Sequence, residues 1–290
     1  MNQKLSASGL LFLLGTSVGW GLNWPIIKYA LEQWPPFSAR GWTGVVGGLA
    51  LALYALARGI PLSLPRAQWP RLIVFSFLNV TLWMAVMGYA MLYLPASEAV
   101  VIAYTNPLFT ALFAWPMLGE RMTLLRVVAL LMAFTGLVLL FGGNEMSATY
   151  AKLPGILLSL SGAIAFALGT IFLKKWPLQL PDATAAAWQV GLGCLPVAIM
   201  GLVFESPSLS ALNAGGWTAL TYMAFGQSLA FVCWFAALAR LPASVAAIGT
   251  MLAPVIGVTV SAIALGEPLG AAKVAALMLT IGGVVLAARP

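Results

Sequence analysis

Five amides interrupt the long apolar stretches of this chain and are the first candidates for binding a polar solute. They are Asn23, Asn79, Asn106, Gln189 and Gln227. In hydrocarbon each polar group is costly unless it faces protein or a water-filled cavity, so each marks a position inside a helix bundle. An amide can bind an ammonium or a carboxylate group without the desolvation penalty of a buried charge.

Aromatic residues accompany these amides at helical spacing. A stripe of amides and rings suits a cavity for an amphipathic, ring-bearing solute, since an indole face stacks on a ring or holds a cation at about 0.5 to 2 kcal/mol. The alternative at each position is an amide that only bonds a neighbouring helix, at about 0.6 kcal/mol. The pairs that share a helix face are Trp20 with Asn23, Asn79 with Trp83, and Gln227 with Trp234.

We therefore expect one substrate-binding set drawn from both halves of the chain. Pro107 and Pro254 fall within apolar spans and should bend or loosen two helices, either as hinge points for gating or as fixed kinks. The ten candidate substrate-binding residues are Trp20, Asn23, Trp24, Asn79, Trp83, Tyr104, Asn106, Phe166, Gln227 and Trp234.

The composition requires lipid as the solvent around these positions. Of 290 residues 62% are hydrophobic and 7% are charged, whereas a soluble domain has roughly a quarter of its residues charged. Continuous apolar runs of about 20 residues predict helices that cross a bilayer, rather than the alternating strands of a closed barrel. The fold class is therefore an all-α membrane protein. Its ten expected spans are residues 8–31, 37–57, 71–93, 98–117, 123–142, 153–173, 183–204, 215–238, 245–264 and 271–288.

Lys and Arg are distributed unevenly at the span ends. With the N-terminus inside, ten of the 14 basic residues lie on the inner side, and Lys28, Arg40, Lys152 and Lys273 remain outside. The positive-inside rule then places both termini in the cytoplasm. The first apolar run is too long for a signal peptide, so we expect it to be retained. The expected location is the bacterial inner (plasma) membrane, with multiple spans.

A repeat organises the spans. The tetrapeptide LPAS occurs at residues 94–97 and again 147 positions later, at 241–244. At the same displacement Pro107 matches Pro254, and further matches at helical spacing extend over some 45 residues without a gap. LPAS itself reads as a helix start, with the Ser as its N-cap.

The repeat divides the chain into residues 1–147 and 148–290, with five spans in each half. Because five is odd, the second half begins on the opposite side of the membrane, and the repeats are inverted. Inverted repeats are typical of transporters that hold a substrate near the midplane and work by alternating access. They also occur in channels, so the pattern favours transport more strongly than it favours one mechanism.

Several segments together resemble a known family. They are WGLNWPIIK at 20–28, Arg40 at the start of the second span, and both copies of PAS…P…LGE. The chain resembles the drug/metabolite transporter superfamily, specifically its ten-helix EamA-type exporters, and within them the bacterial exporters of aromatic amino acids. The resemblance covers the whole chain and implies export. Where the first copy has Asn23 the second has Gly169, so substrate contacts need not be symmetric.

The charged residues near span ends admit two interpretations each. Glu98 could carry protons, or could simply complement the dipole of the helix that starts beside it. Lys28 could meet a substrate carboxylate, but we favour a side chain that reaches the headgroups or pairs with Glu32 four residues later. Glu120 and Glu267 recur after a Gly at matching helix ends and are expected to be structural.

These observations favour a secondary transporter that exports amino acids, aromatic ones in particular, or related small metabolites. Alternatives are export of other amphipathic metabolites or drugs, and a non-coupled facilitator or channel. A membrane enzyme is excluded because the chain has no His and no span holds paired carboxylates or a Cys/His set. A purely structural subunit would have no use for stripes of amides and rings. The expected partners are a small-molecule substrate and the lipid bilayer, with no nucleic acid, cofactor or metal, and the chain is expected to be a monomer.

Overall fold

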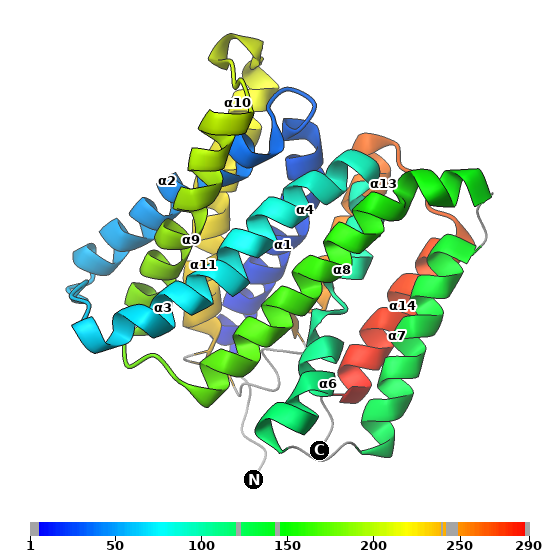
Figure 1. Cartoon of the computed structure of the whole chain (residues 1–290), viewed down its shortest axis with the longest axis horizontal. Helices are drawn as coiled ribbons and strands as arrows, with labels where there is room; N and C mark the ends of the chain where they lie inside the picture. Colours follow the sequence, from blue (N-terminus) through cyan, green and yellow to red (C-terminus); the bar gives the residue numbers. More distant parts are fainter. Residues whose placement is uncertain (1–5, 120–122, 143–145, 239, 242–248, 288–290) are drawn as a thin grey trace.

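The computed structural model describes residues 6–119, 123–142, 146–238, 240–241 and 249–287. Helices account for the regular structure of these residues, with no strand among them (Figure 1). The first half contains α1 (Ala7–Ala30), α2 (Pro36–Ala57), η1 (Arg66–Gln68), α3 (Trp69–Ser76), η2 (Phe77–Thr81), α4 (Leu82–Tyr93), α5 (Ala96–Ala103), α6 (Asn106–Leu118) and α7 (Leu124–Gly142). The second half contains α8 (Met146–Lys175), α9 (Asp182–Phe204), η3 (Leu209–Ala211), α10 (Ala214–Thr221), η4 (Tyr222–Gly226), α11 (Gln227–Leu238), α13 (Leu252–Leu265) and α14 (Ala271–Ala287).

The elements follow the expected spans closely, which confirms the all-α membrane fold. Six helical stretches are long and apolar enough to cross a membrane, and shorter apolar helices follow in α7, α13 and α14. The third span runs without a break through η1, α3, η2 and α4, and the eighth through α10, η4 and α11. The ninth expected span, 245–264, is described from residue 249 onward.

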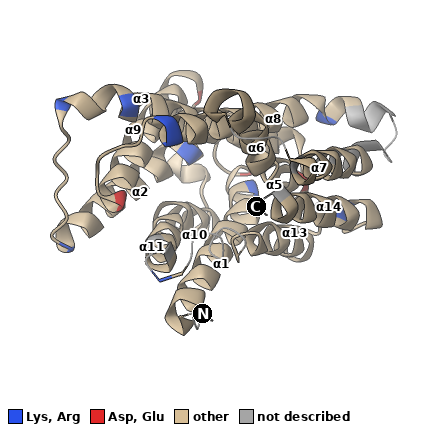
Figure 2. Ribbon diagram, turned by 90° about the horizontal axis from the view of Figure 1, so that it is seen from below, with Lys and Arg blue, Asp and Glu red and all other residues tan. Residues whose placement is uncertain are grey.

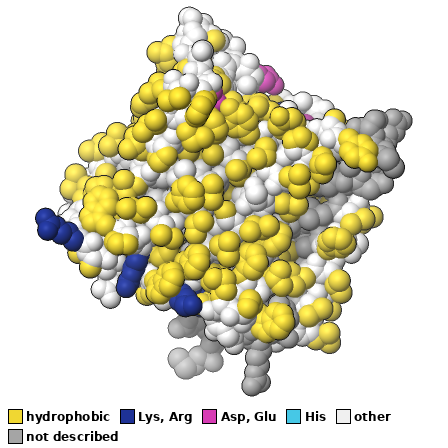
Figure 3. Space-filling model, in the orientation of Figure 1, with side chains coloured by type: hydrophobic (Ala, Val, Ile, Leu, Met, Phe, Trp, Pro, Cys, Tyr) yellow, Lys and Arg dark blue, Asp and Glu magenta, His cyan; other side chains and the backbone are white. Residues whose placement is uncertain are grey.

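The outer surface of the bundle suits lipid. Hydrophobic side chains are spread over the whole face in Figure 3. Figure 2 views the bundle from the end at which both termini are marked, and more Lys and Arg than Asp and Glu are visible there. Large apolar side chains such as Leu11 (69% exposed) and Ile263 (80% exposed) point outward. A soluble protein rarely exposes such contiguous apolar area, so this surface is the one that the bilayer covers.

The contacts between helices are equivalent in the two inverted repeats. In the first half α1 packs between α11 and α13, and in the second half α8 packs in the same way against α4 and α6. The two remaining large contacts each join a helix to its own counterpart, α2 to α9 and α7 to α14. Each half therefore completes the packing of the other, and the space between them lies inside the bundle.

A π-helical turn occurs at the same place in both halves. It spans Phe77–Thr81 (η2) in the third helix and Tyr222–Gly226 (η4) in the eighth. Such turns interrupt regular α-helical bonding and are frequent at functional sites. Asn79 lies within the first of these turns, and Gln227 directly follows the second.

Small residues bring α2 and α9 into close contact. A Cβ on Gly41 would lie 2.3 Å from the backbone nitrogen of Ala198, and one on Gly48 would lie 2.7 Å from that of Gly191. Backbone at this distance leaves no room for a side chain, so glycine is required at both positions.

The prolines lie where two of the spans are interrupted. Just before Pro107 and Pro254 the chain leaves regular helical geometry for two residues, so the helix is loosened there rather than smoothly bent. One interruption is at Tyr104 and Thr105, and Pro107 follows it at the start of α6. The other is at Thr250 and Met251, ahead of Pro254 near the start of α13. Proline lacks a backbone N–H, and the first helical turn is where that donor is not needed.

Candidate functional site

Two adjoining cavities lie between the halves. The first, about 610 Å³, is lined by residues of α1, α2, α4, α5, α6, α8, α11 and α14. The second, about 500 Å³, extends along α2 and α9 to the segment after α8, at Pro177 and Leu178. Both volumes are within the range of about 300–1,000 Å³ typical of small-molecule sites. The residues that line both cavities are Asn23, Arg40, Trp83, Phe166, Gln227, Phe231 and Trp234.

The structure brings the ten candidate residues to this space. Asn79 lines the second cavity, as does Gln189. Pro107 lines the first cavity, whereas Pro254 is buried in α13 and lines neither. A substrate-binding role for these side chains stays a prediction. The other nine candidates, which line the first cavity, are Trp20, Asn23, Trp24, Trp83, Tyr104, Asn106, Phe166, Gln227 and Trp234.

Aromatic rings from both halves form much of the wall. The ring of Trp20 lies 5.5 Å from that of Trp234, and the ring of Trp83 lies 5.2 Å from that of Phe166. Trp24 meets Trp83 edge-on at 6.5 Å and extends the second of these groups. Rings at these separations attract one another and present faces on which a planar solute can stack.

Several buried polar atoms in this wall have no hydrogen-bond partner. They are Trp20 Nε1, Asn23 Oδ1, Asn79 Oδ1, Gln227 Oε1 and Arg40 Nε. A buried donor or acceptor without a partner costs about 1–3 kcal/mol, and most proteins avoid this. Unpaired polar atoms gathered around a cavity are the pattern expected of a site for a polar ligand.

Arg40 is the residue that sequence reasoning misplaced. It was expected at the outer side, but it is 6% exposed and lines both cavities. Its position one turn into a span cannot be distinguished, from sequence alone, from that of an arginine that reaches the headgroups. Phe231 also lines both cavities and was missed, because one ring in an apolar helix carries no distinguishing signal.

The comparisons with known proteins agree with this architecture. Residues 7–142 and 153–289 each match the EamA-like transporter family. The chain belongs to this family. It is 32% identical to the uncharacterized transporter YvbV of Bacillus subtilis over 291 residues, covering 99% of this chain and 93% of that protein. It is 26% identical over 267 residues to the aromatic amino acid exporter YddG of Ancylobacter novellus, covering 87% and 88% of the two chains. A solved crystal structure shares the fold at a TM-score of 0.67 and 24% identity, covering 97% of this chain and 96% of the other.

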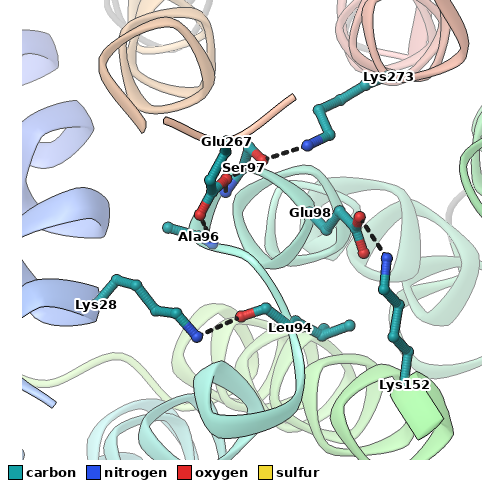
Figure 4. A network of polar contacts seen from close by, with 8 residues as sticks. All are labelled: Lys28, Leu94, Ala96, Ser97, Glu98, Lys152, Glu267 and Lys273. Atoms are coloured by element: carbon teal, nitrogen blue, oxygen red, sulfur yellow. Dashed lines mark hydrogen bonds and ion pairs between the residues drawn. The ribbon is translucent and has the colours of Figure 1, made fainter. Parts of the chain in front are cut away.

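A polar network joins the two halves of this EamA-family transporter where α5, α8 and α14 meet the segment after α13 (Figure 4). Glu267 accepts hydrogen bonds from the backbone nitrogens of Ala96 (2.6 Å) and Ser97 (2.9 Å), and from the Ser97 hydroxyl. Lys273 Nζ donates to the same hydroxyl at 2.7 Å. We call Lys28, Ser97, Glu98, Lys152, Glu267 and Lys273 the outer network, because the distribution of Lys and Arg in the sequence predicts that this end of the bundle faces outward.

The network corrects the expected cap of α5. Ser97 lies inside the first turn and Pro95 is the N-cap, so the free N–H groups are capped by the distant Glu267 instead. Glu267 follows Gly266, which ends α13 with a φ of +66°, as the sequence predicts. Glu120, its repeat counterpart, lies outside the described residues, as does most of the second LPAS segment.

Two further lysines complete the outer network. Lys152 Nζ lies 2.7 Å from Glu98 Oε1, so Glu98 is held in an ion pair. Lys28 Nζ donates to the carbonyl oxygens of Leu94, at 3.0 Å, and of Met91. The expected pairing of Lys28 with Glu32 is therefore wrong for this structure, because the lysine instead satisfies the carbonyls at the end of α4.

The described residues contain no group of three or more His, Cys, Asp or Glu side chains that could hold a metal ion.

Proposed function

We propose that this chain is a secondary transporter that exports amino acids, preferentially aromatic ones, or related small metabolites across the bacterial inner membrane. The observation that carries the proposal is the central space between the halves, where ring faces stand beside buried polar atoms that lack partners. An aromatic amino acid has the matching parts, a planar ring and a charged polar end. The name of the relative YddG, an aromatic amino acid exporter, supports the same substrate class.

The two ends of the central space differ in a way that fits alternating access. At one end of the bundle the outer network joins the two halves through hydrogen bonds and an ion pair. The second cavity extends the other way, to Pro177, Leu178 and Asp182. In the proposed cycle the outer network separates as the opposite end closes, and the turns before Pro107 and Pro254 are the hinge positions.

The orientation is part of the proposal. Arg71 donates to the carbonyl oxygen of Pro177, which lines the second cavity, and Lys174 and Lys175 end α8 just before Pro177. Arg58 and Arg66 flank the loop whose carbonyl oxygens at Pro61 and Leu62 accept from α9. These basic residues therefore lie at the end toward which the second cavity extends, and the positive-inside rule assigns that end to the cytoplasm. The lysines of the other end are engaged in the outer network. The described conformation is then open toward the cytoplasm, ready to load a substrate for export.

A non-coupled facilitator is the second candidate. Asp182 is the one acidic residue among the described residues that line the cavities, and it lies at the far end of the second cavity. The described residues shared by the two cavities therefore include no carboxylate that could carry a proton. Liposomes under a pH gradient or a membrane potential separate the two cases. Uphill accumulation under either gradient shows coupling, and equilibration alone shows a facilitator.

A counterflow screen of a metabolite panel in liposomes tests the proposed function. Purified protein should accelerate exchange of labelled phenylalanine, tyrosine or tryptophan over protein-free liposomes, and leave a sugar of similar size unaffected. Exchange of none of the three aromatic amino acids would contradict the substrate assignment.

A further inference from the structure

Arg40 is a buried cation at the junction of the two cavities. Its side chain is 6% exposed, and its Nε has no hydrogen-bond partner. The side chain crosses α4 at Gly88, where an added Cβ would stand 3.2 Å from Arg40 Cγ. Glycine at this place leaves room for the arginine, which is thereby held against the cavity wall.

None of the described carboxylates neutralises this guanidinium. Glu205 accepts from the backbone nitrogens at the start of α2, at 2.7 and 2.8 Å, and Glu267 caps α5. Glu98 pairs with a lysine. Glu32 and Asp182 are exposed at the ends of helices. A buried charge without a counter-ion is strongly unfavourable, so the site is incomplete without an anion.

Acceptors for a cation line the same two cavities as this arginine. Asn23 Oδ1 and Gln227 Oε1 are buried without partners, and both residues line the same two cavities as Arg40. Amide oxygens bind an ammonium group without contributing a charge that would compete for the guanidinium. The rings of Trp83 and Trp234 line both cavities as well and provide the apolar surface.

We infer that Arg40 binds the carboxylate of the substrate while Asn23 and Gln227 accept hydrogen bonds from its ammonium group. The ligand class is thus the zwitterion of an α-amino acid with a ring or other large apolar side chain. The guanidinium fork can hold both carboxylate oxygens, which gives this contact direction as well as charge. The inference rests on the proposed function and adds the group by which the site distinguishes an amino acid from the corresponding amine.

The test compares three ligands that share one ring. Phenylalanine has both charged groups, phenylalaninamide lacks the carboxylate, and 3-phenylpropionate lacks the ammonium group. In liposomes with the wild-type protein, phenylalanine should compete for counterflow about 10- to 100-fold better than phenylalaninamide, the factor for a charged hydrogen-bonding partner. In Arg40→Gln that preference should disappear, and Arg40→Lys should retain part of it. Arg58→Gln is the matched control, since Arg58 is exposed at the end of α2, and it should keep the full preference.

Thermal unfolding of the ligand-free proteins supplies the second measurement. Arg40→Gln removes a buried charge that has no partner, so its Tm should equal or exceed that of the wild type, and phenylalanine should no longer raise it. A clear fall in Tm would make Arg40 a structural residue and overturn the inference. The inference is also overturned if the wild-type protein exchanges phenylalanine and accepts phenylalaninamide equally well. The proposed function would then still stand. A wild type that exchanges no aromatic amino acid removes the proposed function itself.

Discussion

The hydroxyl of Thr81 donates a hydrogen bond to the carbonyl oxygen of Gly193, 2.7 Å away. In the other half the hydroxyl of Ser228 lies 3.1 Å from the carbonyl oxygen of Gly47, and shares its hydrogen between that oxygen and the carbonyl of Ala224 one turn earlier, at 2.7 Å. Each bond joins the helix that contains a π-helical turn to the second helix of the opposite half. The inverted symmetry therefore extends to single hydrogen bonds, and these bonds hold the two turns that border the cavities.

Removing either hydroxyl should loosen the contact between the halves. We expect Thr81→Val and Ser228→Ala each to lower the free energy of unfolding in mixed micelles by about 1–2 kcal/mol, because a buried carbonyl loses its partner from the other half. Thr218→Val is the control, since that hydroxyl is exposed and bonds only the carbonyl of Ala214 in its own helix. Equal stability of Thr81→Val and Thr218→Val would show that the bond between the halves contributes nothing.

The fold was largely predictable because few backbone structures satisfy their hydrogen bonds inside a lipid bilayer. Apolar length and turn residues located the spans to within a few residues, and the LPAS repeat indicated the symmetry. The sequence located the prolines within spans but did not predict their exact effect, since a bend within one helix and a break between two helices have the same sequence pattern. Here the turn at Tyr104 and Thr105 decides the matter, and only the folded backbone reveals it.

The lining of the cavities was predictable in part. Amides and rings within apolar spans are conspicuous, and helical spacing placed them on shared faces. The outer network was not predictable, because Glu267 and Ser97 are separated by 170 positions and meet only when the halves pack together. Arg40 was missed for a related reason, since its burial depends on α4 and α9, not on its own helix.

The contact between α2 and α9 should not tolerate a methyl group at Gly41. The added Cβ of Gly41→Ala would lie 2.3 Å from the nitrogen and 2.5 Å from the Cα of Ala198, and backbone atoms cannot rotate away. We expect a loss of about 3 kcal/mol or more in stability, and a sharp fall in the yield of folded protein. Gly191→Ala in α9 is the matched control, because its Cβ would meet no atom within 4 Å. That change should stabilise the helix by about 0.5–1 kcal/mol, and an equal effect of the two changes would contradict the packing described.

The pair Glu98 and Lys152 should behave as a coupled unit. Glu98→Gln and Lys152→Gln each leave one partly buried charge without its counter-ion and should lower the free energy of unfolding by about 1–3 kcal/mol. The double variant should lose less than the sum of the two single losses. A double-mutant cycle by thermal or denaturant unfolding measures this coupling, and strict additivity would mean that the ion pair has no energetic role.

The proposed orientation can be checked by labelling single cysteines in intact cells. Ser210, exposed between α9 and α10, and Ser63, exposed between α2 and α3, lie at opposite ends of the bundle. With a membrane-impermeant maleimide, Ser210→Cys should react in intact cells and Ser63→Cys only after permeabilisation. The background is the chain with its native Cys194 and Cys233 replaced by Ala. The reverse pattern would place both termini outside.

The most direct measurement of the central claim is the counterflow rate of aromatic amino acids through variants of one helix. Trp20 and Asn23 line the first cavity, whereas Leu11 lies on the outer face of the same helix at 69% exposure. At equal amounts of folded protein, Trp20→Ala and Asn23→Ala should each slow exchange about 10-fold, the effect of one lost stacking or hydrogen-bonding contact. Leu11→Ala should exchange at the wild-type rate. Wild-type rates in all three variants would contradict passage of the substrate through this cavity.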